Sequence, residues 1–99
     1  MNFFDDKEPP KSGEIFQILH ENRDILIEKI ISSNRQEGKL YNQDHDEWII
    51  LLEGEAILEL KNEKKSLKKG DFLFIVKNTP HKVLQTKNGT LWLCIHIKN

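Results

Sequence analysis

The chain has 99 residues, 37% of them hydrophobic, which provides for one modest core and leaves little room for a second domain. Lys and Arg number 15 against 16 Asp and Glu, so the net charge of −1 lacks the basic excess that nucleic-acid binding uses. The longest apolar run, residues 48–52, is too short to cross a bilayer, and the acidic first ten residues are unlike a secretory signal. We therefore expect a cytoplasmic protein without a nucleic-acid or membrane partner.

Turn residues divide the chain into many short segments. Residues 1–12, which contain Pro9 and Pro10, are expected to form an arm, and residues 13–99 a single domain. The lysine-rich stretch 61–69 is expected to be a solvated hairpin turn. Short strands separated by Gly, Asn and Pro predict an all-β fold, an antiparallel sandwich or barrel. The expected strands cover residues 14–19, 25–32, 48–52, 56–61, 72–76, 81–86 and 91–97.

One expected strand, residues 48–52, is apolar on both faces. Trp48, Ile50 and Leu52 share one face, and Ile49 and Leu51 share the other. An antiparallel strand with one solvated face should alternate between apolar and polar residues. A small barrel has only one interior, so we expect the second apolar face to be covered by the arm or by a second subunit, as in a homodimer.

Two segments carry a more specific pattern, residues 38–55 and residues 70–81. Each resembles one of the two motifs of the cupin superfamily, and together they cover about half of the chain. Glu47 stands seven positions before Gly54, as the motif glutamate does, and His81 stands eleven positions after the glycine that opens the second segment. The chain therefore resembles a small single-domain cupin, which implies a jelly-roll barrel, or double-stranded β-helix.

The departures from the motifs concern the metal ligands of the family. Tyr41 and Gln43 stand where the first motif has its His-x-His pair, and Asn78 replaces a glycine, as the residue that best tolerates a left-handed backbone. Glu47 and His81 match the two remaining ligand positions. The resemblance implies a divalent ion (Fe, Mn, Ni, Cu or Zn) bound inside the barrel beside a small-molecule ligand. The candidate metal ligands are Glu47, His81, Gln43, His96, Tyr41 and His45.

The lesser candidates depend on the direction in which their strands face. Gln43 and Tyr41 share the odd-numbered phase of Glu47 and face the same cavity if that strand is regular. His45 has the same phase, but its polar surroundings are equally typical of a loop. His96 shares a face with Cys94 on the last strand, and the sequence leaves open whether that face points inward. Cys94 itself is either a redox thiol or, as is more frequent, a buried inert residue.

Three functions remain open. The first is a metal-binding cupin that acts on a small polar molecule by dioxygenation or isomerisation. The second is a metal-free isomerase or epimerase in which His81 is the base and Tyr41 the acid. The third is a metabolite-binding module without chemistry. We prefer the first, and the sequence does not decide whether the protein is an enzyme or which substrate it takes.

Overall fold

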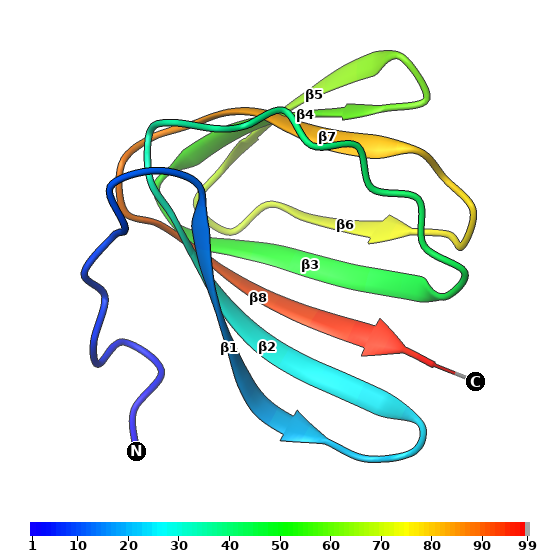
Figure 1. The fold of residues 1–99 in the computed structure, drawn as a ribbon, viewed down its shortest axis with the longest axis horizontal. Helices are drawn as coiled ribbons and strands as arrows, with labels where there is room; N and C mark the ends of the chain where they lie inside the picture. The colour runs from blue at the N-terminus through cyan, green and yellow to red at the C-terminus, as the bar shows by residue number, and fades with distance from the viewer. Residues whose placement is uncertain (99) are drawn as a thin grey trace.

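The computed structural model describes residues 1–98, and these form eight strands and no helix, hence no helix able to cross a membrane. The strands are β1 Glu14–Glu21, β2 Ile25–Ser32, β3 Asp46–Glu53, β4 Glu55–Leu60, β5 Glu63–Lys68, β6 Phe72–Ile75, β7 His81–Thr86 and β8 Thr90–Ile97. All strand pairs are antiparallel, in a five-stranded sheet of order β1-β2-β8-β3-β6 and a three-stranded sheet of order β5-β4-β7, which face each other (Figure 1). The predicted all-β jelly-roll barrel is confirmed.

One segment differs from the prediction. Residues 61–69 do not form only a solvated turn, because Glu63–Lys68 make strand β5, paired along β4. The turn itself is short and consists of Lys61 and Asn62, whose φ angles are 49° and 66°. Leu67 supplies the apolar contact that holds β5 to the core. The charged side chains remain at the surface. Because Leu67 is the one apolar residue among them, the hydrophobic pattern of the sequence did not predict this strand.

The barrel interior takes alternate residues from each strand. On β3 the odd-numbered positions Glu47, Ile49 and Leu51 are buried, whereas Trp48 and Ile50 are only half-buried. On β8 all the even-numbered positions are buried, whereas among the odd ones only Leu91 is, so the face whose direction the sequence left open points inward. The core consists of Ile30, Ile49, Leu51, Ala56, Leu58, Leu67, Ile75, Trp92 and Cys94.

The outer face of β3 and β6 remains apolar and accessible. Trp48 pairs with Phe74 and Ile50 with Phe72 across the two strands, and the two phenylalanines are 51% and 63% exposed. The N-terminal arm lies elsewhere, against β2, where the buried Lys29 donates a hydrogen bond to the Asp5 carbonyl. The arm therefore does not cover Phe72 and Phe74, and the expected homodimer stays a prediction.

Candidate functional site

A cavity of about 70 Å³ lies between the two sheets. A larger hollow of about 710 Å³ exists elsewhere on the protein, but its walls contain no histidine, whereas the interior cavity brings together the motif residues. Seven strands and the loop before β3 contribute to the walls. The lining residues are Glu14, Phe16, Glu28, Ile30, Tyr41, Gln43, Glu47, Ile49, Leu58, Ile75, His81, Val83, Trp92, Cys94 and His96.

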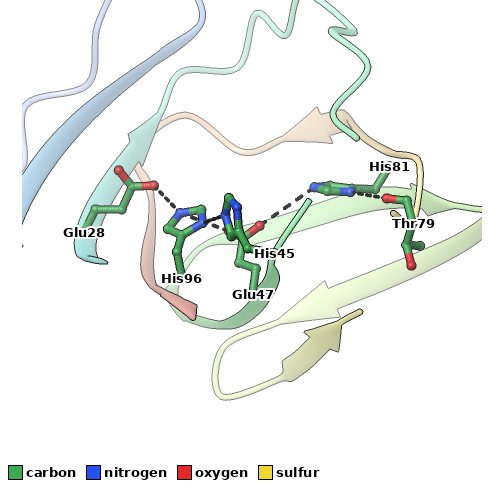
Figure 2. A network of polar contacts seen from close by, with 6 residues as sticks. All are labelled: Glu28, His45, Glu47, Thr79, His81 and His96. Atoms are coloured by element: carbon green, nitrogen blue, oxygen red, sulfur yellow. Dashed lines mark hydrogen bonds and ion pairs between the residues drawn. The ribbon is translucent and has the colours of Figure 1, made fainter. Parts of the chain in front are cut away.

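His81 and Glu47 face each other across this cavity. The Nδ1 atom of His81 lies 2.8 Å from the carbonyl oxygen of Thr79, to which it donates a hydrogen bond. In the neutral ring the Nε2 atom then carries the lone pair, and it points toward Glu47, 3.9 Å from Oε1 (Figure 2). A carbonyl that fixes the tautomer in this way is the usual support for a histidine that binds a metal through Nε2.

The segment around Tyr41 lies beside the start of β7, where Tyr41 forms an isolated antiparallel β-bridge with His81. Its backbone exchanges two hydrogen bonds with His81, of 2.8 and 2.9 Å, and its ring stacks on the imidazole at 5.7 Å. Burial and the neighbouring carboxylates, Glu14 first among them, raise the pKa of the Tyr41 phenol. Tyr41 therefore orients His81 and keeps its own proton at neutral pH.

His96 enters the cavity from β8 and is held on both ring nitrogens. Its Nε2 lies 2.8 Å from Glu28 Oε1 and 3.7 Å from Glu47 Oε2, and its Nδ1 lies 2.8 Å from Nε2 of His45 (Figure 2). Burial opposes a positive charge on His96, but the hydrogen bond to Glu28 and the charges of Glu47 and Glu28 outweigh it and raise the pKa. His45 lies behind His96 in a loop, outside the cavity wall.

Two interior carboxylates were missed by the sequence reasoning, Glu14 and Glu28. Ser32 donates a hydrogen bond to Glu14 and accepts one of 2.9 Å from the Trp92 indole. Burial raises the pKa of Glu14, as it raises that of Glu47. Glu28 opposes Cys94 on β8 and so shares the inward face of that strand, a register that the sequence alone does not show.

Gln43 carries the unsatisfied polar atom of the site. Its side-chain oxygen is buried and has no hydrogen-bond partner within residues 1–98. Its backbone carbonyl, in contrast, accepts a 2.7 Å hydrogen bond from the amide of Asn78, which has the expected left-handed φ of 62°. A buried oxygen without a donor costs free energy, so its place in the cavity wall indicates a missing partner.

The donors in the cavity fit a divalent ion by type. Glu47 offers a carboxylate, His81 a neutral imidazole nitrogen and Gln43 an amide oxygen, whereas His96 is already engaged by Glu28. As they stand, no three His, Cys, Asp or Glu side chains among residues 1–98 form a group that could hold an ion. Five of the six candidate ligands line the cavity, and the sixth, His45, contacts one of them.

The thiol of Cys94 also faces this cavity. It is 2% exposed, and burial together with the charges of Glu47 and Glu28 raises its pKa well above the ordinary value. The thiol is therefore protonated and lies beside the Glu47 carboxylate. A thiol in this state is a poor nucleophile, which argues against a redox role.

The comparisons with known proteins agree with this fold. The family model described as Cupin domain matches residues 30–96. An uncharacterised protein from Methanocaldococcus jannaschii is 33% identical over 87 residues, 82% of this chain and 70% of that protein. A proposed mannose-6-phosphate isomerase from Ralstonia eutropha JMP134 superposes with a TM-score of 0.90 at 31% identity, over 100% of this chain and 97% of that one. KdgF from Halomonas sp. gives 0.80 at 19% identity, over 88% and 82%.

Proposed function

Because this chain belongs to the cupin family, we propose that the cavity inside its barrel binds a divalent metal ion together with a small polar molecule. The observation that carries the proposal is the pair of Glu47 and His81. Both side chains are nine-tenths buried, and their facing atoms lie 3.9 Å apart, beyond hydrogen-bonding distance. Two buried polar groups that face each other without bonding are better explained by a shared third partner.

Each ligand would have a distinct part. His81 would bind through Nε2, with its ring fixed by the Thr79 carbonyl and by stacking on Tyr41. Glu47 would supply the negative charge, and Gln43 the weak oxygen donor that its unsatisfied carbonyl provides. Loaded with iron, manganese, nickel, copper or zinc, the site would polarise an oxygen of the bound molecule.

The remaining polar residues handle protons. His96 Nε2 lies 2.8 Å from Glu28, and the hydrogen bond and neighbouring charges raise the pKa of His96, so its protonated form is favoured. The His96 ring lines the cavity and would donate that proton to a molecule bound there.

A metal-free isomerase is the second candidate, and one observation favours it. Tyr41 stacks on His81, which places a protonated phenol, the group that would act as the acid, beside the imidazole base. The relative from Ralstonia eutropha, described as a proposed isomerase, is compatible with this alternative.

Calorimetric titration of tag-free, chelator-treated protein with zinc and with manganese separates the two candidates. We expect the parent to bind one ion, His81→Ala to lose binding, and Gln43→His to bind more tightly because an imidazole replaces a weak oxygen donor. His20→Ala is the matched control, since His20 is exposed on β1. If His81→Ala binds metal as the parent does, the assignment is wrong. If the parent binds none and Gln43→His creates a site, the barrel is metal-free and the isomerase or binding-module alternatives apply.

A further inference from the structure

Three polar groups of the cavity are free to accept hydrogen bonds. The Gln43 side-chain oxygen has no donor among residues 1–98, and in the neutral His81 ring Nε2 is the acceptor because Nδ1 carries the proton. The Glu47 carboxylate lies beside the Cys94 thiol, a weak donor, and 3.7 and 3.9 Å from the two imidazoles. A ligand that satisfies these atoms must bring donors rather than further acceptors.

The charges of the lining residues favour the same kind of ligand. Glu14, Glu28 and Glu47 line the cavity, and its lining residues include no lysine or arginine. The positive charge that the raised pKa of His96 favours is already paired with Glu28 at 2.8 Å. A phosphate or carboxylate ligand would therefore enter without a counter-charge, at a high desolvation cost.

A second hollow of about 60 Å³ adjoins the cavity and repeats this pattern. It shares Glu14, Tyr41 and Val83 with the cavity and adds Glu37 as a further carboxylate. Lys39, a cation in its lining, lies over the Tyr41 ring at 5.3 Å from the centroid.

We propose that the barrel selects a small donor-rich molecule, one that carries an amino group and hydroxyls, and discriminates against phosphates and carboxylates. The inference concerns the metal-free protein, in which the atoms proposed to hold the ion are free, and it rests on the proposed function in one respect, namely that this cavity is the ligand site. It separates the chain from the sugar phosphate named for the relative from Ralstonia eutropha.

Three probes of nearly equal size test the inference: ethanolamine, ethylene glycol and glycolate, which are cationic, neutral and anionic at neutral pH. Each is titrated into ¹⁵N-labelled, tag-free, chelator-treated protein, and amide shifts are followed, with the Gln43 side-chain amide as the reporter. We expect ethanolamine to bind with a dissociation constant on the order of millimolar, as suits four non-hydrogen atoms, and roughly tenfold more tightly than glycolate. Ethylene glycol should lie between them.

Charge-removing variants show whether the interior carboxylates set this preference. Glu47→Gln should reduce the preference for ethanolamine to about threefold or less, and Glu14→Gln serves the same purpose if the first variant fails to fold. Glu8→Gln, in the exposed arm, should leave it unchanged.

The inference is overturned if glycolate binds in the cavity as tightly as ethanolamine, or if none of the three probes shifts the cavity residues. The zinc titration is scored separately. A protein that binds zinc but prefers glycolate refutes the inference and keeps the proposed metal site. A protein that prefers ethanolamine but binds no metal refutes the proposed metal site and keeps the inference.

Discussion

The two motif glycines, Gly54 and Gly70, allow a direct test of why the barrel needs glycine at its turns. Both have a positive φ, of 96° and 90°. A Cβ atom at Gly54 would lie only 2.8 Å from Thr90 Cα and 2.9 Å from Thr90 Cβ, whereas a Cβ at Gly70 would meet nothing within 4 Å. Alanine at the two positions therefore brings the same backbone strain but different crowding.

The magnitudes follow from these two terms. A positive φ costs a residue with a Cβ about 1–2 kcal/mol, which is the full effect expected for Gly70→Ala. At Gly54 overpacking adds about 1–3 kcal/mol, because Thr90 has little freedom to move. Thr90 is fully buried, and its hydroxyl donates a 2.6 Å hydrogen bond to the Lys87 carbonyl. We expect Gly54→Ala to lose about 2–5 kcal/mol in total.

Urea unfolding followed by tryptophan fluorescence measures both variants on the same day and at the same pH. Each 1 kcal/mol should lower the melting temperature by about 4–8 °C in a domain of this size, so a thermal scan is an independent check. Equal unfolding midpoints for Gly54→Ala and Gly70→Ala, with unchanged slopes, would show that the contact with Thr90 is not what requires glycine at Gly54.

Three further predictions concern pH, assembly and the arm. Burial raises the pKa of Glu14 above 4.5, and the carboxylates of Glu28 and Glu47 raise the pKa of His96 above 6.5. The folded state therefore holds these two protons more tightly than the unfolded state. Stability should therefore fall as pH rises from 4.5 through both folded pKa values, and urea midpoints of Glu14→Gln should fall less steeply. Sedimentation at micromolar concentration should reveal a homodimer that buries Trp48 and Phe74, and a species of only 11.7 kDa would refute it. Deletion of residues 1–10 should leave a cooperatively folding barrel of lower stability, so a broad, non-cooperative transition would place the arm in the core.

Sequence patterns predicted the fold where local chemistry and long-range packing agree. The strands that contain Glu47 and His81 lie between turn residues and occupy motif spacings, so the expected segments match β3 and β7 closely. Asn78 takes the left-handed backbone that the motif needs, with a φ of 62°. In each of these cases the neighbours along the chain were sufficient evidence.

The rest of the site depends on pairing between distant strands. Nothing near Glu28 in the sequence shows that it lies opposite Cys94, and without that register the inward face of β2 is undetermined. His96 was left open for the same reason. The carboxylates of Glu14 and Glu28 looked like ordinary surface residues, because the histidine and hydroxyl partners that make their burial tolerable lie on other strands.

The position of β8 bears on how the protein is made. This strand is synthesised last of the eight, yet it pairs in the middle of the five-stranded sheet, between β2 and β3. While the chain emerges from the ribosome, the facing edges of β2 and β3 have no partner, and the cavity lacks Trp92, Cys94 and His96. The site can therefore form only after translation has passed these residues. Until then, two apolar strand edges are available to other nascent chains, which makes this interval the one most exposed to aggregation.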